Sequence, residues 1–128
     1  MKKSNRMLKI SKLKLKSQKA YDSEKTYNGK SDILRYELLY KFGGIYIDAD
    51  SSWLGSLDLG NLIKETNKSG FFIARECGGK YKDFECKEGL ASGVVGSSKN
   101  NPITKYLVDT INENYFKCHK TGEAYQTI

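Results

Sequence analysis

Two aspartates separated by a single residue, Asp48 and Asp50, directly follow the short apolar run Gly44–Ile47. Residues two apart on an extended backbone point to the same side, so both carboxylates could reach one hard divalent cation that also holds ligand phosphates. This is the chemistry of binding a nucleotide diphosphate. For an isolated Asp-X-Asp the alternative is a solvated turn whose side chains bond their own backbone.

A carboxylate and a guanidinium precede this pair. Asp32 and Arg35 lie three residues apart in an expected helix, and therefore on one face of it. They could offer a carboxylate and a planar guanidinium to a polar ligand, such as sugar hydroxyls and a phosphate. The alternative is a surface ion pair that adds little stability.

The elements that must position these groups can be predicted from the same stretch. Ser31 is a suitable N-cap and Gly43 a suitable left-handed stop, which predicts a helix over residues 32–42. The β-favouring run Gly44–Ile47, with glycines before it and acids after it, predicts a short buried strand. The two aspartates are then expected at the exit of that strand.

The whole segment carries a longer pattern, Ser-Asp-X-X-Arg followed by Leu-Tyr-X-X-Gly-Gly-X-Tyr-X-Asp-X-Asp. This pattern resembles the core signature of the Asp-X-Asp glycosyltransferases, which include fungal initiating α-1,6-mannosyltransferases and capsular or lipopolysaccharide enzymes. The clostridial glucosylating toxins carry a similar stretch. The resemblance is strong over residues 31–57 and looser elsewhere. It implies an α/β fold of the GT-A type, a Rossmann-like nucleotide-sugar-binding domain.

The resemblance also implies roles for five residues. Asp32 and Arg35 would contact the donor sugar and carry the catalysis, with Arg35 assisting departure of the leaving group, and Tyr46 would line the donor site. Asp48 and Asp50 would hold ribose, metal and diphosphate, with Asp50 as a direct ligand of Mn²⁺ or Mg²⁺. The implied reaction moves a hexose from a UDP- or GDP-sugar to a hydroxyl of a glycan, lipid-linked or protein acceptor, with retention of configuration.

Further elements are predicted downstream. Residues 71–76 are expected to form a strand ending in Glu76, a modest site candidate, and residues 90–97 a small-residue strand in which Ser92 stands where the family usually has asparagine. A short helix is expected over residues 59–66. Asn101 and Pro102 should open a last helix. Its apolar stripe consists of Ile103, Leu107, Val108, Ile111 and Tyr115. This alternation of helices and strands favours the α/β class.

The chain has 128 residues, enough for one domain. The resemblance implies a longer protein, because the family's opening strand has no counterpart before Ser31 and a Gly-Pro segment is expected beyond Ile128. We therefore expect a basic N-terminal arm over residues 1–20 and the central, incomplete part of a GT-A-type domain over residues 21–128. Another chain could complete the domain.

Charge is concentrated at the N-terminus. Residues 1–20 hold eight Lys or Arg and no acid, which leaves a formal charge of −1 for the rest of the chain. Because no aromatic residues are interleaved with these charges, the pattern does not favour nucleic acid as a partner. It indicates a solubilising arm, and binding to an anionic membrane surface is a weaker alternative. No signal peptide or membrane-spanning run is visible in the sequence, so the default expectation is a cytoplasmic protein, with peripheral membrane binding left open.

The remaining reactive side chains match no known motif. Cys77, Cys86 and Cys118 lack the paired spacing of a zinc site, and His119 is given no catalytic role. Two other function classes stay open. One is a phosphohydrolase of the haloacid dehalogenase type with Asp48 as nucleophile, which fits less well because Ser-Ser-Trp follows Asp50. The other is a non-catalytic fragment that binds metal and nucleotide sugar.

Overall fold

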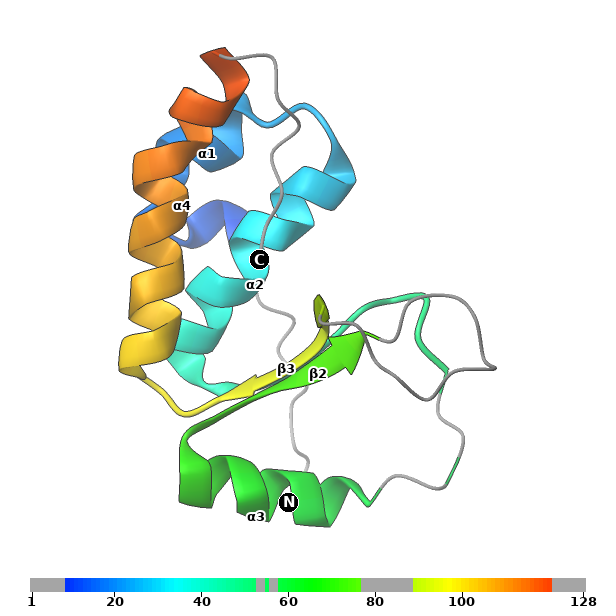
Figure 1. Ribbon diagram of the computed structural model, residues 1–128. Coiled ribbons are helices and arrows are strands. Elements are labelled where there is room, and N and C mark those ends of the chain that lie inside the picture. The colour runs from blue at the N-terminus through cyan, green and yellow to red at the C-terminus, as the bar shows by residue number, and fades with distance from the viewer. Residues whose placement is uncertain (1–8, 53–54, 56–57, 77–88, 121–128) are drawn as a thin grey trace.

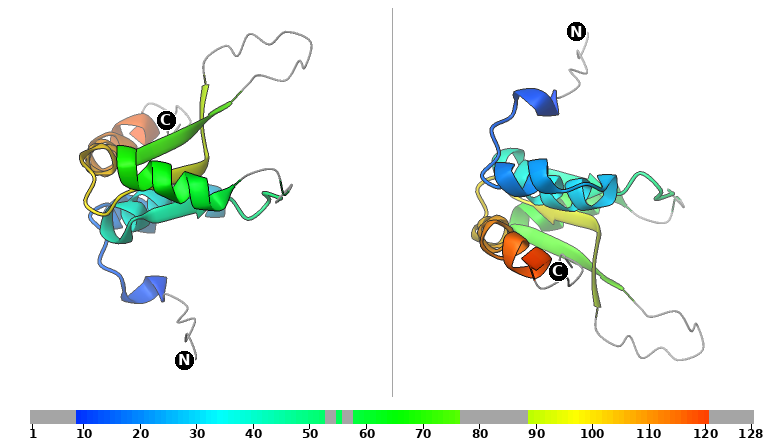
Figure 2. Two further views of the ribbon diagram at one scale, coloured as in Figure 1. Left: turned by 90° about the horizontal axis from the view of Figure 1, so that it is seen from below. Right: turned by 90° about the horizontal axis from the view of Figure 1, so that it is seen from above.

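The structure is a computed structural model of the chain, and it describes residues 9–52, 55, 58–76 and 89–120. Three helices, α1 (Gln18–Ser23), α2 (Tyr27–Phe42) and α4 (Pro102–Lys120), pack together beside a small sheet (Figure 1). A fourth helix, α3 (Leu59–Ser69), lies on the opposite side of the strands from α2 (Figure 2). A short 3₁₀ turn, η1 (Ile10–Lys12), precedes α1.

Helix α2 carries most of the predicted site and starts five residues earlier than predicted. Its N-cap is Thr26, whose hydroxyl accepts a hydrogen bond from the Gly29 amide at 3.0 Å, so the prediction of Ser31 as the cap is wrong. The helix ends at Gly43 as predicted. Gly43 has φ 68°, and a Cβ there would lie 2.8 Å from the backbone nitrogen of Lys99. Only glycine therefore fits this tight connection into the next strand.

The sheet contains β1 (Gly44–Ile47), β2 (Phe71–Glu76) and β3 (Gly89–Ser97) in the order β1-β3-β2. All three predicted strands are present, and β3 begins one residue before its predicted start. The prediction that β1 is buried is wrong, because Gly44 and Ile47 are exposed and the two residues between them are half-buried. Both pairings are antiparallel, with Ile47 opposite Val94 in the pairing of β1 with β3. The described residues therefore form a mixed helix-and-strand fold around an antiparallel sheet, and the Rossmann-like GT-A architecture stays a prediction.

A hydrophobic core cluster lies between the helices, and Val95 on β3 is buried as well. The cluster is formed by Ala20, Ile33, Tyr36, Val108, Ile111 and Tyr115. Helix α4 starts as predicted, since the Asn101 side chain accepts the Ile103 amide at 2.8 Å. Ile103 itself is 46% exposed, and Thr104 is buried instead. The buried stripe follows spacings of three and four residues from Thr104, the period of one helical face.

Part of the basic N-terminal segment belongs to this core. Leu15, Ser17 and Ala20 are buried, and the Ser17 amide donates to the Glu37 carboxylate on α2 at 2.7 Å. On the other side of the sheet, α3 is capped by Asp58, extends three residues beyond its predicted end, and stops at the left-handed Gly70. Within the described residues, no helix combines the length and the apolar character needed to cross a membrane.

Candidate functional site

One face of α2 and the end of β1 enclose a pocket of about 520 Å³. Helix α2 contributes residues spaced three and four apart, which places them on a single face of the helix. The turn after β1 contributes the two aspartates of the Asp-X-Asp motif. The lining residues are Asn28, Ser31, Asp32, Arg35, Tyr46, Asp48, Ala49 and Asp50. All five residues predicted for the site therefore line the same pocket, and their roles toward a ligand stay predictions.

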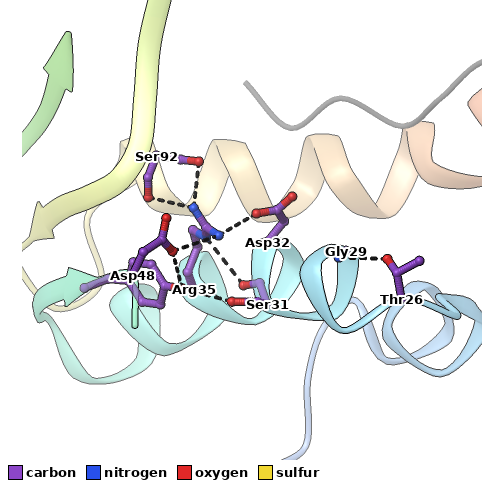
Figure 3. Close-up of polar contacts among 8 residues, drawn as sticks. Thr26, Gly29, Ser31, Asp32, Arg35, Asp48 and Ser92 are labelled. Carbon is purple, nitrogen blue, oxygen red and sulfur yellow. Dashed lines mark hydrogen bonds and ion pairs between the residues drawn. The ribbon is translucent and has the colours of Figure 1, made fainter. Parts of the chain in front are cut away.

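Arg35 stands at the centre of the pocket wall and is 5% exposed (Figure 3). Its Nη2 forms ion pairs with Oδ1 of Asp32 at 2.5 Å and Oδ1 of Asp48 at 3.4 Å. Its Nη1 donates to both the carbonyl and the hydroxyl oxygen of Ser92, each at 2.7 Å. Its Nε donates to the Ser31 carbonyl at 3.5 Å. Every guanidinium nitrogen thus has an acceptor, which fixes the plane of the group.

The predicted donor-site tyrosine orients Asp48. The Tyr46 hydroxyl donates to Oδ1 of Asp48 at 2.8 Å, and its oxygen lies 2.9 Å from the Ser31 hydroxyl. Because the tyrosine proton points at Asp48, Ser31 is the donor in the second bond. Burial raises the pKa of Tyr46 above its usual value, so the hydroxyl keeps its proton at neutral pH. The Arg35 guanidinium also lies over the ring of Tyr46, with its Cζ 4.6 Å from the ring centroid.

The two aspartates of the motif differ in their surroundings. The side chain of Asp48 is held by Tyr46 and Arg35, and its backbone amide donates to the Gly93 carbonyl at 2.8 Å. Asp50 is exposed in the following turn, where the Ser51 amide donates to the Asp48 carbonyl at 3.0 Å. One carboxylate is therefore held in place by the protein, and the other faces solvent at the pocket.

The pocket offers a divalent cation two neighbouring carboxylates, Asp48 and Asp50. In the part of the chain that the structure describes, no group of three or more His, Cys, Asp or Glu side chains could hold a metal ion. Mg²⁺ is commonly bound by one or two carboxylates and completes its shell with waters and substrate phosphates. Asp48 and Asp50 fit this donor set, although they would not form a dedicated metal cage.

The charges of the pocket restrict what can bind there. Three carboxylates and one guanidinium leave a formal charge of −2 on the lining residues. An anionic ligand would be repelled by this arrangement unless a cation accompanied it. A neutral polyhydroxyl group would instead find several hydrogen-bond acceptors at the pocket wall.

Two neighbours of the site, Ser92 and Gly93, were not predicted as its functional residues. They lie on β3, directly beyond the pairing with β1, and so face both Arg35 and Asp48. A Cβ at Gly93 would lie 3.0 Å from Oδ2 of Asp48, so the absence of a side chain there leaves room for the carboxylate. The replacement of the family's asparagine by Ser92 was the only signal in the sequence that pointed to this place.

The side chains of the other residues singled out in the sequence are not among those that the structure describes. Glu76 ends β2, and nothing is described of its side chain. Cys77 and Cys86 lie outside the described residues, as do the side chains of Cys118 and His119.

Comparison with known proteins supports the family that the motif predicts. A family model described as a glycosyltransferase sugar-binding region containing a DXD motif matches residues 1–69, which include α2, β1 and the two aspartates. An uncharacterised glycosyltransferase, L373 of Acanthamoeba polyphaga mimivirus, is 33% identical over 87 residues. That alignment covers 68% of this chain and 30% of the viral protein. No solved structure gives a significant match.

Proposed function

Since the chain belongs to the glycosyltransferase family whose sugar-binding region contains a DXD motif, we propose that its pocket binds a nucleotide-sugar donor together with Mn²⁺ or Mg²⁺. The observation that carries this proposal is the grouping of Asp32, Arg35 and the Asp-X-Asp aspartates around one pocket. A surface ion pair and a solvated turn, the two alternatives from the sequence, would not need to share a pocket.

Asp48 and Asp50 would hold the cation, with Asp50 as the more accessible ligand. Tyr46 and Arg35 both bond Oδ1 of Asp48, so this carboxylate is oriented before any ligand arrives. When bound, the cation supplies positive charge to the diphosphate and thereby favours departure of the nucleotide. The charge of −2 on the lining residues makes metal and nucleotide binding interdependent.

Asp32 and Arg35 would serve the sugar side of the donor. The Asp32 side chain is 30% exposed and can accept hydrogen bonds from sugar hydroxyls while Arg35 holds one of its oxygens. Arg35 places a fixed positive charge beside the position proposed for the diphosphate. Tyr46 forms part of the wall between them. Holding the sugar and the diphosphate in one orientation is a major source of rate acceleration in group transfer.

The proposed reaction is transfer of a hexose from a UDP- or GDP-sugar to a hydroxyl of a glycan, lipid-linked or protein acceptor, with retention of configuration. The aligned segment makes up 30% of the viral relative, so activity of the whole protein and its acceptor belong to the proposal. A non-catalytic nucleotide-sugar-binding role would use the same pocket. The family match does not support the phosphohydrolase alternative, in which Asp48 would be the nucleophile.

The test is calorimetric titration of the chain with UDP and with GDP, with and without Mn²⁺. We expect binding to require the metal, and Asp50→Asn to weaken the metal-dependent affinity by about tenfold or more. Asp109→Asn is the matched control, because Asp109 lies on α4, pairs with Lys105 and does not line the pocket. Equally strong binding without metal, unaffected by Asp50→Asn, would count against the proposed site.

A further inference from the structure

We infer that Ser92 on β3 is a positioning residue that fixes the Arg35 guanidinium in the pocket wall. The consequence of this role, the orientation of donor-binding groups, rests on the proposed function. Ser92 lies outside residues 1–69, the part of the chain that the family model matches. It does not line the pocket itself, and it bonds Arg35, which does.

Ser92 binds the guanidinium through two acceptors. Its carbonyl and its hydroxyl both accept from the same nitrogen, Nη1 of Arg35, at 2.7 Å each. Arginine has five N–H donors in a rigid planar fork, so holding one end of the fork determines where the other end points. With Nη1 held by Ser92, the opposite nitrogen, Nη2, faces Asp32 and Asp48 (Figure 3).

The Ser92 hydroxyl is itself held by a residue of the core. A hydrogen bond joins its side chain to Tyr36, which is 1% exposed and packs among the core residues. Because arginine can only donate, the hydroxyl accepts from Arg35 and has its own proton available for Tyr36. The serine thus links a rigid part of the fold to a charged group of the pocket. A residue without a hydroxyl at this position would lose both bonds.

Ser97 on the same strand differs from Ser92 in the partner of its hydroxyl. Ser97 is buried whereas Ser92 is half-buried, and the Ser97 hydroxyl donates to the neighbouring Ser98 carbonyl at 2.9 Å and does not bond Arg35. The two serines share residue type and strand, and they differ in whether the hydroxyl bonds a charged group of the site. Ser97→Ala is therefore a control for the general cost of removing a serine hydroxyl from β3.

The experiment compares Ser92→Thr with Ser92→Val, which have the same shape and differ in the hydroxyl. Both are β-branched and suit a strand, so folding is expected in each. In the ligand-free protein, NMR of the Arg35 guanidinium protons, assigned with Arg35→Lys, should show slow exchange in wild type and Ser92→Thr. Exchange should be faster in Ser92→Val. UDP affinity with Mn²⁺ should fall about threefold to tenfold in Ser92→Val alone.

The two proposals can fail separately in this design. Identical Arg35 signals in the Thr and Val variants would overturn the role of Ser92, whatever the protein binds. The role of Ser92 would also be overturned if Ser97→Ala disturbed the Arg35 signals and the UDP affinity as much as Ser92→Val does. Absence of metal-dependent nucleotide binding in the wild type would overturn the proposed function, while the signals of the free protein would still decide whether Ser92 holds Arg35.

Discussion

Helix α2 has a core face and a pocket face, which differ in the interactions that their side chains make. Ile33 and Tyr36 face the helical core with α1 and α4, whereas Asp32 and Arg35 face the pocket. Apolar packing depends on area and shape and has little directionality. The pocket depends on hydrogen bonds and ion pairs whose directions set where each charged group lies. Stability and ligand binding should therefore respond to different residues of the same helix.

The same contrast exists between two tyrosine–carboxylate pairs. The Tyr115 hydroxyl donates to Glu24 at 3.1 Å and ties α4 to the end of α1. The Tyr46 hydroxyl donates to Asp48 at 2.8 Å in the pocket, where Ser31 and Arg35 join the network. Burial raises the pKa of both tyrosines. Identical chemistry therefore holds helices together in one region and orients a proposed metal ligand in the other.

The largest expected effect is on the core face. Ile33 is fully buried, and Ile33→Ala should lower the free energy of unfolding by about 2 to 5 kcal/mol, because it removes packed methyl groups and leaves a cavity. Urea denaturation measures this change. The control is Ile63→Ala on α3, where the side chain is half exposed and the expected loss is below about 0.5 kcal/mol.

If Ile33→Ala also changed the binding of UDP and Mn²⁺, the distinction between the core face and the pocket face of α2 would fail. Affinity should be measured at a temperature where the variant is folded and expressed per folded molecule. We expect it to stay within about twofold of wild type, because the Ile33 side chain packs in the helical core and does not line the pocket. A large loss of affinity would show that the two faces of α2 are coupled.

These two faces also explain how much of the molecule the sequence predicts. The end of α2 at Gly43, the strand β1 and the start of α4 at Asn101 depend on neighbours within a few residues, and each was predicted. The start of α2 was missed because Thr26 and Ser31 are both suitable caps. In the structure, the Ser31 hydroxyl bonds Tyr46 instead.

Contacts between distant segments were beyond prediction. The antiparallel pairing of β1 with β3 joins residues about fifty positions apart, and no local preference specifies which strands become neighbours. Ser92 enters the site only through this pairing, 57 residues away from Arg35. The motif thus predicted the groups that line the pocket, whereas the group that holds them came from the tertiary structure.

An intermediate effect is expected on the pocket face. Arg35→Lys keeps the charge but cannot bond Asp32, Asp48 and Ser92 together, because an ammonium group lacks the planar fork. We expect metal-dependent UDP affinity to fall by about tenfold to a hundredfold, with a smaller loss of stability than in Ile33→Ala. Calorimetry and urea denaturation of the same samples give both numbers.

Asp32→Asn is the companion variant for the pocket face. It preserves the size of the side chain and removes the charge that pairs with Nη2 of Arg35. Both variants should weaken binding more than they weaken the fold. If they unfold the domain and leave affinity per folded molecule unchanged, Arg35 and Asp32 are structural residues and the contrast between the two faces of α2 disappears.

The smallest expected effect concerns pH and compares the two tyrosines. Burial, followed by the hydrogen bond to Glu24, raises the pKa of Tyr115 to about 12. An unfolded tyrosine ionises near pH 10. The folded state therefore favours the neutral hydroxyl, and this contribution is fully present below pH 10 and is lost as the pH rises toward 12. Because pH 11 lies one unit above the pKa of the unfolded tyrosine, the free energy of unfolding should be lower there by about 1.4 kcal/mol.

The measurement is the free energy of unfolding of wild type and Tyr115→Phe at pH 9 and pH 11. Other groups titrate in both proteins, so only the difference between them reports on Tyr115, and the stability advantage of wild type should shrink at the higher pH. Tyr46→Phe is the matched control, because it removes the other tyrosine–carboxylate bond. We expect Tyr46→Phe to weaken metal-dependent UDP binding at neutral pH and Tyr115→Phe to leave it unchanged. An equal loss of affinity in both variants would contradict the distinction between a bond that holds helices together and one that orients a ligand of the metal.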